Sequence, residues 1–114
     1  FTGVDGQTSM LFNYASGAQA VLNCTAFAKS PTTATIVGTK ARIEVDTMFY
    51  APSTFTLIGR DGTATRFEPP HVGNGLHYQA DEVARCLRAG LLESPAMPLE
   101  ETVSIMETMD AVLG

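Results

Sequence analysis

The sequence has few basic residues and no long apolar run. Lys and Arg number only seven among 114 residues, against twelve Asp and Glu, and the net charge is -5. Because phosphate binding needs clustered Lys and Arg, this balance argues against nucleic acid and against an acidic membrane surface as partners. No stretch approaches the roughly 18 to 20 apolar residues that span a bilayer, and no basic start leads into an apolar segment. We therefore expect a soluble, cytoplasmic protein.

Cysteine and histidine are also scarce. Cys24 and Cys86 lie far apart without the C-x-x-C spacing of a zinc or redox pair, and each falls in an apolar or amphipathic pattern. We expect two buried free thiols, with a reactive or disulfide role as the alternative. His71 and His77, the only histidines, lack ligand spacing, so no metal site is predicted.

The motifs of several enzyme classes are missing. No G-x-S-x-G elbow surrounds any serine, which removes the nucleophile signal of one large hydrolase class. Four aspartates fall mostly at expected turns or helix starts, where capping explains them better than acid–base chemistry. They are Asp5, Asp46, Asp61 and Asp81. The residues alone therefore predict no complete active site.

Short β-branched and aromatic runs fill the first two-thirds of the chain and predict three antiparallel hairpins. The expected strands are 8–14 with 19–27, 33–37 with 41–46, and 54–58 with 63–68. Asp61-Gly62 is the strongest turn signal, because glycine accepts a positive φ without a steric penalty. At this length we expect one α+β domain, residues 1–114, with a single core and an open, mainly antiparallel sheet of about six strands.

Alternation distinguishes strands covered on one face from strands covered on both. In 41–46, Ala41, Ile43 and Val45 point one way and charged residues the other, as in a half-solvated strand. The first hairpin, by contrast, has apolar residues on both faces. We expect this chain's helices to cover one face of the sheet and another subunit or domain to cover the other.

The last third has helical periodicity. An amphipathic helix is expected to pack on the sheet and to end at Gly90, with acids early and arginines late. Its apolar stripe is Leu76, Ala80, Val83, Ala84 and Leu87. A second helix is predicted from Pro98, with Glu100 and Glu101 in its first turn. Its buried stripe is Leu99, Val103, Met106, Met109 or Asp110, and Leu113.

Gly73 and Gly75 have the spacing that begins a dinucleotide-binding loop. However, Tyr78 stands where a third glycine would be, and Pro69-Pro70 cannot end a central strand. The glycines are better explained as a flexible entry to the helix. His77 and Tyr78 begin that helix, where they could exchange a proton with a substrate or bind its hydroxyl. The alternative is that Tyr78 packs and His77 caps the helix or is solvated.

Two stretches resemble a known family. IVGTKARIEV (36–45) and HYQADEVARCLRAGLLESPAMPLEETVSIMETMDAV (77–112) are similar to the C-terminal domain of Gfo/Idh/MocA NAD(P)-dependent oxidoreductases, and most similar to the dihydrodiol-dehydrogenase-like members. The resemblance implies an N-terminal Rossmann domain that binds NAD or NADP, followed by a sheet domain that shapes the substrate site and contacts other subunits. The family's cofactor loop, E-K-P lysine and G-G-x-L-x-D stretch are not found in these 114 residues.

The resemblance therefore implies the substrate-pocket and oligomerisation domain of an enzyme acting on a sugar-like or cyclic hydroxyl compound. This chain would be inactive alone, contain no catalytic residue and bind no cofactor. The loop 29–32 and the helix start would face substrate, with Ser30, His77 and Tyr78 as contacts. Phe1 in place of an initial Met suggests a piece of a longer protein. The alternative is a non-enzymatic binding or assembly module with the same sheet.

Overall fold

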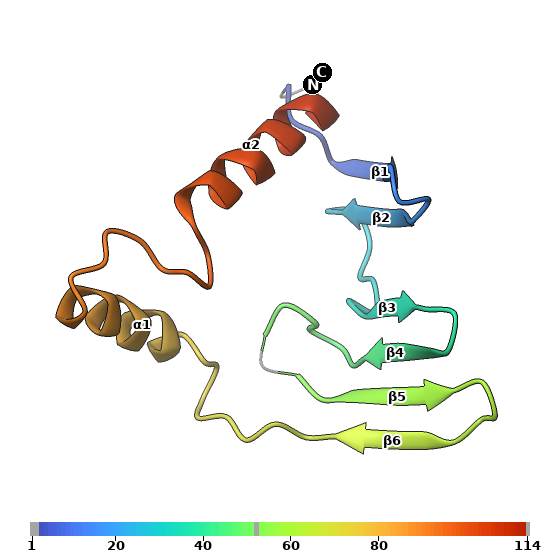
Figure 1. The fold of residues 1–114 in the computed structure, drawn as a ribbon. Helices are drawn as coiled ribbons and strands as arrows, with labels where there is room; N and C mark the ends of the chain where they lie inside the picture. Colours follow the sequence, from blue (N-terminus) through green and yellow to red (C-terminus); the bar gives the residue numbers. More distant parts are fainter. Residues whose placement is uncertain (1–2, 52, 114) are drawn as a thin grey trace. The chain divides into compact units, whose positions relative to one another are not determined.

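The computed structural model describes residues 3–51 and 53–113, which form six strands and two C-terminal helices (Figure 1). The elements are β1 (Gln7–Asn13), β2 (Gln19–Thr25), β3 (Ala34–Val37), β4 (Ala41–Val45), β5 (Phe55–Gly59), β6 (Ala64–Phe67), α1 (His77–Arg88) and α2 (Leu99–Leu113). The predicted α+β class and the three hairpins are confirmed. The chain divides into two compact units, 1–30 with 108–114, and 31–107.

The six strands form two antiparallel sheets, where the sequence predicted one. β1 pairs with β2, and the order in the second sheet is β3-β4-β5-β6. Between β2 and β3 the chain contains Pro31, which has no N–H to donate, and Thr32, whose φ is +54°. These two residues end the extended strand conformation between β2 and β3.

In the β1–β2 hairpin, Met10 pairs with Leu22, and Phe12 pairs with Ala20, so one face is apolar. The opposite face is polar except for the neighbouring pair Leu11 and Val21, which are 60% and 80% exposed. The prediction that both faces of this hairpin are apolar is therefore confirmed for one face, and on the second face only for the pair of Leu11 and Val21. The register explains the difference, because it separates Leu11 and Val21 from every other apolar side chain of the two strands.

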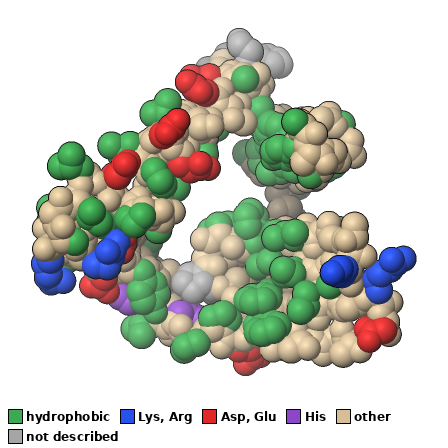
Figure 2. All heavy atoms as spheres, viewed as in Figure 1, with side chains coloured by type: hydrophobic (Ala, Val, Ile, Leu, Met, Phe, Trp, Pro, Cys, Tyr) green, Lys and Arg blue, Asp and Glu red, His purple; other side chains and the backbone are tan. Residues whose placement is uncertain are grey.

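The β3–β6 sheet has two chemically different faces. One is apolar, with Phe55 stacked on Phe67 at 4.9 Å between ring centroids. Its members are Ala34, Ile36, Ala41, Ile43, Val45, Phe55, Leu57 and Phe67. Figure 2 shows hydrophobic side chains gathered over these strands. Charged residues and threonines occupy most of the other face, and the predicted alternation in β4 is confirmed.

Helix α1 ends as predicted, with Gly90 at a φ of +69°. Its acids, Asp81 and Glu82, lie in the N-terminal half of the helix but not in its first turn, and Arg85 and Arg88 occupy the last turn as predicted. The stripe predicted to pack on a sheet is exposed, with Val83 at 58% and Leu87 at 72%. In α2, Glu100 and Glu101 lie in the first turn as predicted. Its apolar stripe is exposed as well, including Leu99, Val103, Met106, Met109 and Leu113.

Among the described residues, Cys86 is the one buried hydrophobic side chain. The predicted burial of Cys86 is therefore confirmed, whereas Cys24 is exposed, and both are free thiols. Cys24 lies near the end of a two-stranded sheet, where a single neighbouring strand cannot enclose a side chain. The expected single core is not formed by these residues. Neither helix in the described ranges is long and apolar enough to cross a membrane.

Candidate functional site

His77 and Tyr78 form an exposed aromatic corner at the start of α1. Their ring centroids lie 4.0 Å apart with the planes tilted by 42°, and the Tyr78 side chain is 45% exposed. The Tyr78 hydroxyl oxygen accepts a hydrogen bond from the backbone N–H of Val72 at 3.1 Å. Its hydroxyl hydrogen remains available to donate, so Tyr78 can bind an oxygen acceptor while it closes its own loop.

The loop that enters α1 is built from short-range hydrogen bonds. The N–H of Gly75 donates to the carbonyl of Val72 at 3.3 Å, and the N–H of Leu76 donates to Oδ1 of Asn74 at 3.3 Å. Gly73 and Gly75 have φ of +56° and +79°, which explains glycine at both positions. The glycines therefore form the helix entry that the sequence predicted.

These residues do not fit a dinucleotide. The strand before them, β6, ends at Phe67, and Pro69-Pro70 separates it from the glycines, so no strand leads directly into the loop. The side chain of Tyr78 bonds to the loop backbone, where a third glycine would let a helix pack closely. No step of a reaction can be assigned to a cofactor held by this loop.

Ser30, the third predicted contact, is exposed and belongs to the first unit, whereas His77 and Tyr78 belong to the second. The structure thus brings two of the three predicted residues together. The loop that follows Ser30 is tied to the β4–β5 loop within the second unit. Thr47 donates its hydroxyl to the Pro31 carbonyl at 2.9 Å, and the N–H of Phe49 donates to the Thr32 carbonyl at 3.2 Å.

A cluster centred on Glu82 was not anticipated from the sequence. Arg85 donates to both carboxylate oxygens of Glu82, at 2.7 and 2.8 Å, and Ser94 donates to one of them at 2.6 Å. The thiol of Cys86 donates to the same oxygen at 3.4 Å. Glu93 then accepts the N–H of Leu99 at 2.7 Å, which caps α2. The cluster thus ties α1 to the loop that leads to α2, and the separate bond of Glu93 caps α2.

The cluster sets the protonation of its members. Hydrogen bonds from Arg85 and then Ser94 lower the pKa of Glu82 to about 2, so its carboxylate is ionised at neutral pH. Burial and the bond to Glu82 raise the pKa of Cys86, which keeps the thiol protonated and poorly nucleophilic. The spacing of Glu82, Arg85 and Cys86 already places them on one helix face. The approach of Ser94 depends on tertiary structure.

A second polar network lies across the β3–β6 sheet. Arg66 donates to Asp46 and to Thr54, both at 2.8 Å, and to Glu68 at 2.9 Å. The Thr54 hydroxyl also donates to Asp46, and these bonds, Thr54 first and Arg66 second, lower the pKa of Asp46. Asp46 is thus a structural acceptor here. Within the described ranges, no group of three or more His, Cys, Asp or Glu could hold a metal ion.

No protein-family model and no solved structure matches the chain. It is 34% identical over 120 residues to trans-1,2-dihydrobenzene-1,2-diol dehydrogenase of Xenopus laevis, across 98% of this chain and 36% of that protein. The mouse (Mus musculus) protein of that name is 33% identical over 117 residues, which cover 96% of this chain and 34% of the mouse protein.

A third relative is the D-xylose 1-dehydrogenase (NADP(+)) of Hypocrea jecorina, 37% identical over 86 residues, 68% of this chain and 22% of that protein. The first two similarities cover nearly all of the described elements. The chain spans about a third of the length of the curated relatives it matches.

Proposed function

Because this chain belongs to the family of the trans-1,2-dihydrobenzene-1,2-diol dehydrogenases, we propose that it is the C-terminal domain of a Gfo/Idh/MocA-type oxidoreductase. The proposed substrate is a cyclic or sugar-like compound with adjacent hydroxyls. The names of the relatives support this choice, since one acts on a dihydrobenzenediol and another on D-xylose. The observation that carries the proposal is the 34% identity over 98% of the chain.

In this proposal NAD or NADP is bound by an N-terminal Rossmann domain and not by residues 1–114. The loop at Gly73 and Gly75 supports this division, because Tyr78 and the preceding prolines leave no place for a pyrophosphate. The NADP(+) in the name of one relative supports a nicotinamide cofactor for the whole protein. The protein would work in the cytoplasm and have no activity in the present chain alone.

The role of this chain is to orient the substrate. Tyr78, whose hydroxyl is fixed by Val72, would donate its hydrogen to a substrate oxygen, and His77 would flank the same side of the ring. Ser30 is the third residue proposed to contact the substrate, through its hydroxyl. A hydroxyl already anchored at its oxygen loses little freedom on binding, which favours recognition.

Self-association is the second proposed role. Leu11 and Val21 form an exposed apolar pair on an otherwise polar hairpin face, and apolar pairs of this kind are covered when subunits meet. A second copy of the protein is the proposed partner.

The test is an assay of the full natural polypeptide that carries residues 1–114. Trans-1,2-dihydrobenzene-1,2-diol and D-xylose are each supplied with NAD⁺ or NADP⁺, and formation of reduced nicotinamide is followed. We expect oxidation of at least one compound. Tyr78→Phe removes one hydrogen bond to substrate and should raise KM about fivefold, with little change in kcat.

Tyr14→Phe is the matched control, because it removes the same hydroxyl from an exposed position in the first hairpin. An analogue with only one hydroxyl distinguishes a lost substrate contact from a change in the loop. If Tyr78 contacts the second hydroxyl, Tyr78→Phe raises the KM of the diol and leaves the KM of the analogue unchanged. Absence of oxidation with both cofactors would overturn the proposed activity and favour an assembly module. Equal KM values in Tyr78→Phe and Tyr14→Phe would remove Tyr78 from the pocket.

A further inference from the structure

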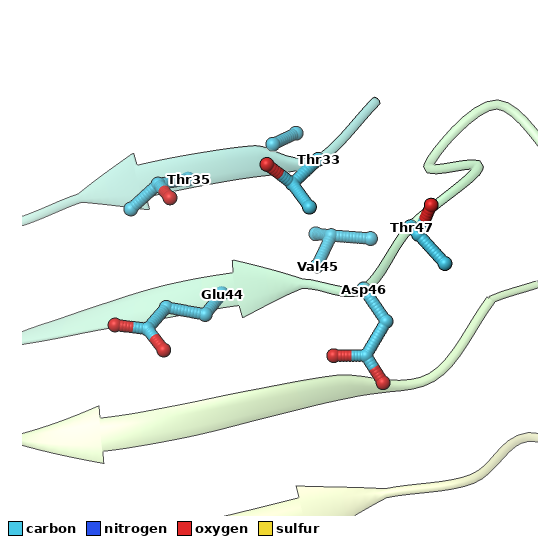
Figure 3. A pocket seen from close by; sticks show the side chains of 7 residues that line it. Thr33, Thr35, Glu44, Val45, Asp46 and Thr47 are labelled. Carbon is cyan, nitrogen blue, oxygen red and sulfur yellow. The ribbon is translucent and has the colours of Figure 1, made fainter. Parts of the chain in front are cut away.

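The open hollow beside β3 and β4, shown in Figure 3, is lined by residues of both sheet faces. Val45 lies on the apolar face and its neighbour Glu44 on the polar one, so the hollow presents no single kind of surface to a ligand. The loop before α1 is different. There Asn74 and Gly75 bring together the groups of a reaction that needs neither a cofactor nor a partner.

The amino acid that follows an asparagine decides how easily the asparagine side chain reacts with the backbone. The chain has three asparagines, Asn13, Asn23 and Asn74. Tyr and Cys follow the first two, whereas Gly75 follows Asn74. A backbone nitrogen that attacks the side-chain carbonyl carbon of the preceding asparagine closes a five-membered ring. Glycine has no Cβ to shield that nitrogen and reaches the required backbone angles at little cost, so we expect Asn74 to react fastest.

Strands β1 and β2 hold the other two asparagines in an extended backbone. Asn13 pairs with Gln19 and accepts a hydrogen bond from its side-chain nitrogen at 2.7 Å, and Asn23 pairs with Ser9. In a strand the side chain stands out of the pleat and away from the following N–H. Asn74, by contrast, is exposed in a turn, where its side chain can meet the next backbone nitrogen.

The loop already directs a donor at the atom that gains charge in this reaction. The N–H of Leu76 donates to Oδ1 of Asn74 at 3.3 Å. When Gly75 attacks Cγ of Asn74, Oδ1 becomes an oxyanion, and a donor already in place stabilises it. Leu76 is also the N-cap of α1, so the positive end of the helix dipole favours negative charge at this position.

The attacking nitrogen is only weakly restrained. Its N–H donates to the carbonyl of Val72 at 3.3 Å, which is longer than most N–H···O bonds. Gly75 has a φ of +79°, in the left-handed region that glycine adopts freely. Because Asn74 is exposed, water and hydroxide reach this part of the loop. The proton of Gly75 can therefore be removed without breaking a strong contact.

We propose that Asn74 modifies itself by deamidation, with Gly75 as the nucleophile. The backbone nitrogen of Gly75 loses its proton to water or hydroxide and bonds to Cγ of Asn74, while the side-chain amide nitrogen takes up a proton and leaves as ammonia. Water then opens the resulting succinimide at either carbonyl carbon, which leaves aspartate or isoaspartate. Nothing is oxidised or reduced, and water is the only other reactant. This modification site goes beyond the proposed oxidoreductase function.

Either product changes the start of α1. A carboxylate replaces the neutral amide beside a helix whose first turn has no acid, and it adds one negative charge to the net charge of -5. Isoaspartate also adds one carbon to the main chain between Val72 and Tyr78, whose hydrogen bond closes this loop. We therefore expect this bond to be lost in the isoaspartate form. An accompanying rise in KM rests on the proposed function, because it requires Tyr78 to contact substrate.

The experiment is a timed incubation of the full natural polypeptide at physiological temperature, followed by tryptic peptide mapping with mass spectrometry. Asn74 lies in the peptide 67–85, and Asn13 and Asn23 lie in a peptide that ends at Lys29. We expect aspartate and isoaspartate to accumulate at Asn74 and not at the other two. The rate should rise up to about tenfold per pH unit, since the attacking form has lost a proton. It should also be at least as high as in the free synthetic peptide 67–85, because the folded loop supplies the donor.

Gly75→Ala and Gly73→Ala form a matched pair, because both glycines have a positive φ in the same loop, +79° and +56°. Only the first variant places a Cβ next to the attacking nitrogen, so the modification should be lost in Gly75→Ala and retained in Gly73→Ala. Asn74→Gln keeps an amide but needs a larger ring, so it should also remain unmodified. Circular dichroism of each variant establishes that the fold is intact.

Four results would overturn the proposal. They are an unmodified Asn74, modification of Asn13 or Asn23 to the same extent, equal modification in Gly75→Ala and the parent, and a rate in the folded protein below that of the free peptide. The peptide map needs no substrate or nicotinamide cofactor. Its failure therefore leaves the proposed oxidoreductase function untouched, and a failed turnover assay leaves the deamidation untouched.

Discussion

The β3–β6 sheet and the β1–β2 hairpin are built from similar residues but are stabilised differently. The sheet separates an apolar face, with stacked Phe55 and Phe67, from a face crossed by the Arg66 network. The hairpin has short polar contacts, such as that from Gln19 to Asn13 at 2.7 Å, and leaves Leu11 and Val21 exposed. Because isolated two-stranded sheets are marginal in water, the hairpin depends on contacts beyond its own strands, whereas the sheet carries much of its own stabilisation.

The largest effect is expected from Phe55→Ala. It removes one of the two stacked rings of the apolar face and should lower the free energy of unfolding by about 2 kcal/mol, less than for a fully buried Phe. Phe27→Ala is the control, because Phe27 is 80% exposed, and should change stability by less than about 0.5 kcal/mol. Chemical unfolding followed by circular dichroism measures both. Equal losses would refute the distinction between sheet and hairpin.

The next effect concerns assembly. Val21→Glu places a charge in the exposed apolar pair and should weaken self-association at least about tenfold, without changing the stability of the β3–β6 sheet. Sedimentation velocity over a range of concentrations measures this shift. Asn23→Glu, which adds the same charge on the same hairpin face, is the control. A strictly monomeric parent protein would contradict the proposed interface.

A smaller effect is expected at two matched turns. Gly17 and Gly62 have φ of +85° and +86°, and a Cβ at either position would meet nothing within 4 Å. Alanine therefore adds backbone strain alone, about 1 kcal/mol at each site. If the two regions differ as described, Gly62→Ala should lower the global stability, and Gly17→Ala should mainly speed hydrogen exchange in β1 and β2. Global destabilisation by both to the same extent would show that the hairpin folds as one unit with the sheet.

The smallest effect is the pH dependence of the Arg66 network. The pKa of Asp46 is lowered in the folded state by Thr54 and Arg66, so its stabilisation is present above the unfolded value near 3.8. It is lost as the pH falls through the lower folded pKa. Asp46→Asn should therefore reduce the thermal midpoint at neutral pH, and the difference from the parent should shrink in acid. Glu68→Gln, whose carboxylate is more exposed, should have a weaker effect.

The candidate sites were predictable to different degrees. His77 and Tyr78 follow from their position at a helix start, and their mutual contact is local in sequence. The Glu82 cluster was predictable in part. Helical spacing aligns Glu82 with Arg85 and Cys86, whereas Ser94 comes from the loop after the helix and its approach cannot be predicted from spacing.

The sequence by itself determined the hairpins, the two helices, the turn glycines and the kinship with dihydrodiol dehydrogenases. Each of these depends on periodicity, on φ preferences or on matched motifs, which are properties of neighbouring residues. Only the tertiary structure decided that six strands divide into two sheets, that Cys24 is exposed while Cys86 is buried, and that Glu82 bonds to Ser94 of the loop between the two helices. These outcomes depend on which distant segments meet, and burial and hydrogen bonding between such segments are not encoded in any local pattern.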